Sequence, residues 1–285
     1  MIQSMTGYGK AILELPRKKI SIEIKTLNSK NLDLNVRLPS CYREKELELR
    51  SKLSQLLVRG KVDFSIFIDT NGGETTTTIN KEVVNNYIDQ LREIAITSPE
   101  NTLEVAMRLP DVLKTEREEL DENEWIEIDK TINKAVVEVN QFRSDEGKVL
   151  KQDFSDRIKT IQKLSEQVVE LDKERLRLVR EKLEKSIADL KQNVDENRFE
   201  QELIYYLEKL DITEEKVRLN NHLDYFLQEL TSDISNGKKL GFISQEIGRE
   251  INTLGSKSNF APMQQVVVQM KDELEKIKEQ LLNVL

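Results

Sequence analysis

The chain has 285 residues, of which 38% are hydrophobic, 34% are charged and only 5% are aromatic. No stretch approaches the roughly eighteen apolar residues of a membrane span, and the opening MIQSMTGYGK lacks the apolar run of a secretory signal. We therefore expect a cytoplasmic protein without membrane contact. Cys41 is the only cysteine, which excludes an intrachain disulfide and a zinc site built from several thiolates.

The charge is unevenly distributed along the chain. Residues 1–70 hold thirteen Lys or Arg and eight Asp or Glu, a net of +5, so the formal net charge of −8 leaves −13 for the rest. This asymmetry permits a basic face for a polyanion in one part and acidic groups for a metal ion in another. The alternative is that these charged side chains only keep the protein surface hydrated and form no binding site.

The first third of the chain has strand patterns. The segments ISIEIK from Ile20 and LDLNVRLP from Leu32 alternate apolar and polar residues and are separated by TLNSKN, which predicts a hairpin. A helix is expected over about 43–58, followed by a strand in RGKVDFSIFID. The two glycines of NGGETTTT, after Asn71, indicate a flexible loop.

Helical patterns dominate the rest. Residues 124–196 form an almost continuous helix-compatible stretch with a narrow apolar stripe, which predicts that an antiparallel helix or another subunit covers it. Further helices are expected over about 199–211, 214–235, 238–254 and from Met263 to the end, with Gly255 as a helix terminator. The stripe of the long helix contains Leu176, Val179, Leu183, Ile187 and Leu190.

These patterns predict an α+β fold. We expect an N-terminal antiparallel sheet with helices in residues 1–155, a long helical arm in residues 156–198, and an all-helical C-terminal domain in residues 199–285.

The candidate active site lies in the last third. Glu246 and Glu250 stand one turn apart on the helix over 238–254, away from its apolar stripe. The preceding helix, over 214–235, carries His222, the only histidine. Folding the two helices antiparallel would bring His222 toward the carboxylates.

This set suits phosphodiester cleavage by two routes that the sequence does not separate. In one, Glu246, Glu250 and neutral His222 hold a divalent ion, Mn²⁺ or Mg²⁺, which polarises a phosphoryl oxygen and activates water. In the other, His222 with a carboxylate acts as general base on the ribose 2′-hydroxyl and yields a cyclic phosphate.

Basic side chains near these residues suit a phosphate. Arg218, Arg249 and Lys257 could neutralise its charge, and GSKSN could present backbone amides, although no P-loop pattern occurs. The competing interpretation is that Glu and Arg at helical spacing form exposed ion pairs and that His222 is an ordinary surface residue.

Several motifs together resemble those of the YicC-like family of bacterial proteins. They are MIQSMTGYGKA, EIKTLNSKNLDLNVRLP, RGKVDFSI, RSDEGKVLKQDF and, near the end, RLNNHLDYFLQEL and GKKLGFISQEIGREINTLGSKS. The resemblance spans both ends of the chain in the right order. It implies an endoribonuclease that assembles as a ring-shaped hexamer and takes RNA into a central cavity.

The resemblance also implies site residues. Among them are His222, Lys239, Glu246, Arg249, Glu250, Asn252, Ser256, Lys257, Asn28 and Arg37. Together with the residue patterns above, we assign catalysis to His222, Glu246, Arg249 and Glu250, metal binding to Glu246, Glu250 and His222, and RNA binding to Arg218, Lys239, Asn252, Ser256, Lys257, Arg37, Asn28 and Lys30. The resemblance further singles out Ser4, Thr6, Gly7, Gly9, Arg143, Glu146 and Gly147. The family often has Asn, His and Arg where this chain has Asn28, Ser29 and Lys30, so a mechanism with two histidines is disfavoured.

The sequence therefore predicts a metal-assisted endoribonuclease that acts within a homo-oligomeric ring. The alternative is a non-catalytic RNA-binding adaptor or helical scaffold that works with another nuclease.

Overall fold

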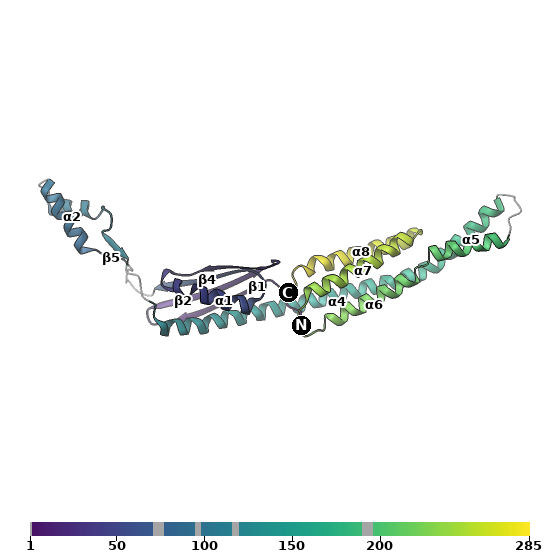
Figure 1. Cartoon of the computed structure of the whole chain (residues 1–285), viewed down its shortest axis with the longest axis horizontal. Coiled ribbons are helices and arrows are strands. Elements are labelled where there is room, and N and C mark those ends of the chain that lie inside the picture. Colours follow the sequence, from purple (N-terminus) through teal and green to yellow (C-terminus); the bar gives the residue numbers. More distant parts are fainter. Residues whose placement is uncertain (1, 71–76, 95–97, 116–119, 190–195) are drawn as a thin grey trace.

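The computed structural model describes residues 2–70, 77–94, 98–115, 120–189 and 196–285. The molecule is elongated, with a sheet toward one end and a bundle of helices toward the other (Figure 1). The long helix α4, Glu122–Asp189, runs without a break along both parts. Both chain ends lie near the middle of the molecule, where the sheet meets the bundle.

The sheet has four strands in the order β1-β2-β4-β3. These are β1 (Gly7–Glu14), β2 (Lys18–Leu27), β3 (Leu32–Arg37) and β4 (Gly60–Thr70). β2 pairs antiparallel with β1 and β4, whereas β3 runs parallel to β4. The α+β class is confirmed, but the sheet is mixed and not purely antiparallel.

The predicted hairpin between β2 and β3 is wrong. β4 lies between them, because the chain leaves β3 through the 3-10 helix η1 (Ser40–Lys45) and helix α1 (Glu46–Leu57) and returns parallel to β3. Such a crossover is what a parallel pair requires. The four apolar side chains of β4 that face the core are Val62, Phe64, Ile66 and Ile68, and this strand takes a central place.

One face of the sheet carries the first hydrophobic core. Ile20, Ile22 and Ile24 of β2 alternate toward this face and are fully buried. Leu53 of α1 and Ile132 of α4 pack into the same cluster, so both helices cover the same side of the sheet. The opposite face carries the alternate side chains of the strands, as the period-two alternation predicts. Many of them are polar or charged, but Tyr8, Ile12 and Phe67 are also exposed there.

Gly7 and Gly9 lie inside β1, not in a turn. A Cβ at Gly9 would stand 2.3 Å from the carbonyl oxygen of Ala135 and one at Gly7 would stand 3.1 Å from Val139. The glycines therefore allow α4 to approach the sheet closely. Their role in the structure is packing of the helix against the sheet.

A small lobe is inserted between β4 and α4. Helix α2 (Lys81–Ile94) and helix α3 (Pro99–Ala106) pack around Val84, and strands β5 (Thr77–Ile79) and β6 (Leu113–Thr115) pair antiparallel. The predicted glycine loop after Asn71 lies outside the described residues.

Four helices follow α4 into the bundle. They are α5 (Glu196–Lys209), α6 (Thr213–Glu229), α7 (Gly237–Lys257) and α8 (Ala261–Leu281). α5 packs back against the end of α4, and the stripe residues Leu176, Val179 and Leu183 are partly buried. Leu190 of the predicted stripe lies outside the described residues. Among the described residues, no helix is both long enough and apolar enough to cross a membrane.

Helix α7 continues past the position predicted to terminate it. Gly255 is helical, and α7 ends at Lys257. A Cβ at Gly255 would stand 3.1 Å from Val267 of α8, and one at Gly248 would stand 3.2 Å from Leu274. The two glycines lie seven residues apart on one face of α7 and permit close contact with α8. The terminator prediction was wrong because Gly255 has a packing role.

The chain ends join the sheet to the bundle. Ser4 donates its backbone N–H to Arg143 of α4 and forms an antiparallel bridge with Val284. Gly147 of α4 lies so close to this segment that a Cβ there would stand 2.1 Å from the carbonyl oxygen of Ile2. Arg143 is buried and donates to the carbonyl of Leu57, while burial lowers the pKa of its guanidinium to about 10. It therefore remains charged at neutral pH.

Candidate functional site

Helices α6 and α7 pack side by side and are joined by an ion pair at each end. Lys257 Nζ lies 2.7 Å from Glu215 Oε1 at one end, and Lys239 Nζ lies 2.5 Å from Glu229 Oε2 at the other. Since a residue in the first turn of each helix pairs with the last residue of the other, the two helices run antiparallel. The two ion pairs set their relative register.

This register determines what faces His222. His222 lies seven residues from Glu215 and seven from Glu229, so all three share one stripe of α6. The stripe of α7 that faces it contains Lys239, Glu246, Glu250 and Lys257, whose midpoint lies between the two glutamates. His222 is therefore at the level of the turn that carries Glu246 and Glu250.

The two glutamates have different environments. Glu246 is partly exposed and accepts from Arg249 Nη1 at 3.0 Å, in an ion pair within α7. Glu250 is only 6% exposed, and no hydrogen-bond or ion-pair partner is found for it among the described residues. The carboxylate oxygens of Glu250 are not among the fully buried atoms that lack a partner, so they keep contact with solvent. The pair of Glu246 with Arg249 is the ion pair at helical spacing that the competing interpretation expected. The burial of Glu250 could not be predicted from its spacing along the helix.

The line of contact between α6 and α7, here called the groove, ends at Lys257 in a buried charged network. Lys257 also donates to the carbonyl oxygen of Asp211 at 2.7 Å. The second oxygen of Glu215 is buried without a partner, as is the hydroxyl of Ser258 just after α7. Lys257, predicted to bind RNA, is used here to hold the start of α6 against the end of α7.

Arg175 is the centre of this network, and the sequence analysis missed it. Its side chain is 1% exposed and pairs with Asp172 at 2.6 Å. It also donates to the carbonyl oxygens of Lys257 at 2.8 Å and Leu210 at 2.7 Å. Arg175 therefore connects α4 to the last turn of α7 and to the segment between α5 and α6. In the sequence it appears as one more charge in KERLRL, and no local signal distinguishes it.

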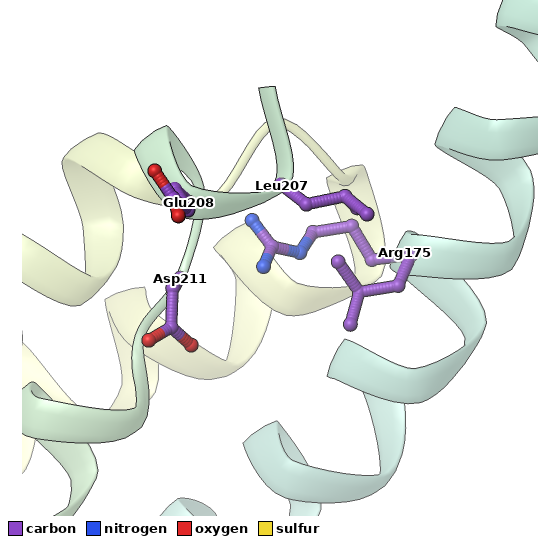
Figure 2. Close-up of a pocket in the computed structure, with 5 residues that line it drawn as sticks. Arg175, Leu207, Glu208 and Asp211 are labelled. Atoms are coloured by element: carbon purple, nitrogen blue, oxygen red, sulfur yellow. The ribbon is translucent and has the colours of Figure 1, made fainter. Parts of the chain in front are cut away.

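A pocket of about 400 Å³ lies beside Arg175. Figure 2 shows the arginine reaching from α4 toward the segment between α5 and α6, with Leu207, Glu208 and Asp211 around it. The Thr213 hydroxyl donates to Asp211 at 2.7 Å and holds the pKa of that carboxyl below its usual range. The same carboxylate oxygen accepts the backbone N–H of Thr213, the first residue of α6, at 3.2 Å, although the N-cap position itself is Ile212.

At the opposite end of the groove, Lys239 lies over the ring of Tyr225, 5.1 Å from its centroid. The hydrogen bond to Glu229, and then that to Tyr225, raises the pKa of Lys239. Tyr225 was not among the predicted site residues, although its position three residues after His222 places it on nearly the same face of α6.

The other predicted RNA-binding residues are divided between the two parts of the molecule. Arg218 is exposed on α6 and pairs with Glu214 at 2.5 Å. Asn252 and Ser256 are exposed on α7, where the Ser256 hydroxyl donates to the carbonyl oxygen of Thr253.

Asn28, Lys30 and Arg37 belong to the sheet. The Asn28 amide donates to Asn283 at 3.3 Å, so it lies beside the C-terminal end, and Lys30 is exposed in the same loop. Arg37 ends β3 on the exposed face, five residues or about 17 Å farther along the strand from Leu32. These residues do not lie on the groove between α6 and α7.

The middle motif lies at the joint between sheet and bundle. Glu146 accepts a hydrogen bond from the Thr6 hydroxyl, which is also hydrogen-bonded to Ser4 at 2.8 Å. Arg143 and Gly147 hold the same segment, as described above. The contacts of Arg143, Glu146 and Gly147 therefore hold the N-terminal segment against α4 at this joint.

The groove contains no preformed metal site among the described residues. Among the described residues, no group of three or more His, Cys, Asp and Glu side chains is placed to hold an ion, and His222, Glu246 and Glu250 are included in that statement. Mg²⁺ commonly takes one or two carboxylates and completes its coordination with water and substrate phosphate. Glu246 and Glu250 fit that arrangement, and they do not fit a preformed site with three ligands.

Comparison with known proteins places these features in a family. The model described as "Endoribonuclease YicC-like, N-terminal region" matches residues 2–152, and the model described as "Endoribonuclease YicC-like, C-terminal" matches residues 168–285. A relative from Clostridioides difficile (strain 630), named "Probable endoribonuclease YicC", is 34% identical over 293 residues and 100% of both chains. A relative of the same name from Haemophilus influenzae is 31% identical, again over 100% of both chains. The chain belongs to the YicC-like endoribonuclease family.

Proposed function

We propose that the protein is an endoribonuclease that cleaves RNA at the groove between α6 and α7. The observation that carries this proposal is the buried, unpaired Glu250 on the stripe of α7 that faces His222. A carboxylate that keeps contact with solvent but has no partner within the described residues is available to a substrate or an ion. The names of the family and of both relatives support the activity.

His222 and Arg249 have different roles in the proposed cleavage of the phosphodiester bond. His222 accepts the proton of the attacking hydroxyl, either the ribose 2′-hydroxyl or a water molecule, and returns a proton to the leaving oxygen. Arg249, on the exposed side of α7, places positive charge near the phosphate as the transition state forms. Its pairing with Glu246 keeps it oriented before RNA arrives.

A divalent ion is part of the proposal. Glu246 and Glu250 would hold it together with the RNA phosphate, and the ion would neutralise developing charge and lower the pKa of a bound water molecule. Dialysis against EDTA followed by addition of Mg²⁺ or Mn²⁺, in the cleavage assay below, tests this requirement directly.

The Glu250→Gln variant is expected to separate activity from stability. It keeps the shape of the side chain and breaks no ion pair, so the free energy of unfolding should change by less than about 1 kcal/mol. Cleavage of an end-labelled RNA should slow at least about 10-fold, the equivalent of about 1.4 kcal/mol of transition-state stabilisation. Gel analysis of the products measures the rate, and urea unfolding followed by circular dichroism measures stability.

Glu246→Gln is the matched control for stability. It breaks only the exposed pair with Arg249, so its free energy of unfolding should change by less than about 1 kcal/mol. If Glu250→Gln is less stable than wild type and cleaves RNA at the wild-type rate, Glu250 is a structural residue and the site assignment fails. Absence of cleavage by wild type under every metal condition would favour the non-catalytic adaptor.

We also propose assembly into a ring of six copies, as the family resemblance implies. Ile204, Tyr205 and Tyr206 are exposed on α5, near the end of the long arm, and present an apolar surface that another copy would cover. Light scattering is expected to report six times the chain mass of 33.2 kDa. A mass of one chain at every concentration would contradict the ring.

A further inference from the structure

The solvent-facing stripe of α7 contains no acidic residue. Its exposed positions are spaced alternately by four and three residues, so they form one straight line along the helix. From Lys238 to Ser256 this line covers eighteen residues, or about 27 Å. Its members are Lys238, Phe242, Gln245, Arg249, Asn252 and Ser256. The line thus consists of two cations, three neutral polar residues and one aromatic residue. A surface of this length without a carboxylate is unusual in a chain with 52 acidic residues.

Two lysines of α8 extend the basic character of this stripe. Lys278 Nζ lies 3.4 Å from the position of a Cβ at Gly248, and Lys271 Nζ lies 3.8 Å from that at Gly255. Both amines therefore lie over the seam between α7 and α8, in space that a larger side chain on α7 would occupy. The glycines that allow the helices to pack closely also admit these lysines beside the stripe.

The charges near the stripe are only partly neutralised within the chain. Arg249 pairs with Glu246, and Lys278 pairs with Glu275 at 2.7 Å. Lys238 and Lys271 have no ion-pair partner among the residues that the structure describes. An anion aligned with α7 would find these two cations at separate points along it. This arrangement is complementary to the repeating charge of a nucleic acid backbone.

Phe242 adds an aromatic surface to the line. Its side chain is 67% exposed, although an apolar ring of this size is normally buried. Lys238 precedes it by one turn, and Glu246 follows it by one turn. Stacking of a nucleobase on such a ring requires a free base face, which an unpaired strand offers and a duplex does not.

We propose that single-stranded RNA binds along this α7 track, with a base stacked on Phe242 and phosphates beside Lys238, Arg249 and Lys271. The inference rests on the proposed function and names its substrate class. The facing stripe with Glu246 adjoins the track, about a quarter turn around the helix, so a strand held there presents a phosphate to the groove. The track is long enough for at least about four nucleotides, the lower range for a single-strand binding surface.

The test is binding of a fluorescein-labelled oligouridylate RNA, measured by anisotropy, with its integrity checked on a gel afterwards. Phe242→Ala is expected to weaken binding by about 5- to 150-fold, the range for loss of one stacked base, while Phe242→Trp retains it. Phe142→Ala is the matched control, since Phe142 is also an exposed aromatic residue but belongs to α4. Lys238→Ala and Lys271→Ala should each reduce the dependence of log affinity on log salt by about 0.7.

A duplex of matched length is the second probe. Wild type should bind it more weakly than the single strand, and Phe242→Ala should remove most of that difference. If Phe242→Ala binds the single strand as wild type does, or if wild type prefers the duplex, the inference is overturned. These titrations do not require cleavage, so an inactive wild type that still shows the Phe242 effect would refute the proposed nuclease activity and leave the track intact.

Discussion

Cleavage of labelled RNA by the His222→Ala variant is expected to be about 10²- to 10⁴-fold slower than by wild type, the usual range for loss of a general acid–base group. We expect this loss because His222 carries the only imidazole of the chain and lies at the level of Glu246 and Glu250. The measurement is a single-turnover rate on end-labelled RNA, with protein in excess so that binding does not limit it.

Asn221→Ala is the matched control for this experiment. Asn221 is exposed and adjoins His222 on α6, so its loss should leave the rate within about 3-fold of wild type. His222→Ala should retain the helical content of wild type and its affinity for the oligonucleotide. A rate for His222→Ala equal to that of the control would mean that another group moves the proton, and the groove would lose its assigned base.

Arg175→Met is expected to lower the free energy of unfolding by about 3–5 kcal/mol, the usual cost of removing one partner of a buried ion pair. The change leaves Asp172 with only the longer ion pair to Lys216 at 3.4 Å. It also removes the donor to the carbonyl oxygens of Leu210 and Lys257. Methionine preserves the length and apolar volume of the side chain, so the effect reports the guanidinium. Urea unfolding followed by circular dichroism measures it.

Arg177→Met is the control, because Arg177 lies two residues away on the same helix but is exposed. It pairs with Glu181 at 3.1 Å in solvent, and its loss should cost less than about 1 kcal/mol. Equal stability of the two variants would show that the buried network contributes nothing. Arg175→Lys should not restore stability, since a single ammonium cannot reproduce the bonds made by the planar guanidinium.

The periodic parts of the fold were predictable because their signals are local. Ile243, Ile247, Ile251 and Leu254 recur at helical spacing, and all four are buried in α7. The start of α6 near Thr213, with Asp211 just before it, was also readable from the residues that favour helix starts. The long helix α4 followed from uninterrupted helical patterning over the region from residue 124.

Features that depend on distant parts of the chain were not predictable in this way. The edge position of β3 depends on β4, which begins 23 residues after β3 ends and enters the sheet between β2 and β3. Gly255 is a residue type that often ends helices, yet here the close contact with Val267 of α8 explains why a glycine stands at this position. Glu250 shares the polar spacing of Glu246, and only the packing of α6 and α7 decides that one is buried and the other exposed.

For this protein, the sequence by itself determined the helix and strand segments, the α+β class and, through its motifs, the family. The tertiary structure alone decided the strand order, the burial of Arg175 and Glu250, and the register that places His222 opposite the two glutamates. The physical reason is the distance along the chain over which each kind of interaction acts. Side-chain periodicity acts within a few residues, whereas burial and ion pairing depend on which surfaces meet, and those surfaces are separated by tens of residues along the chain.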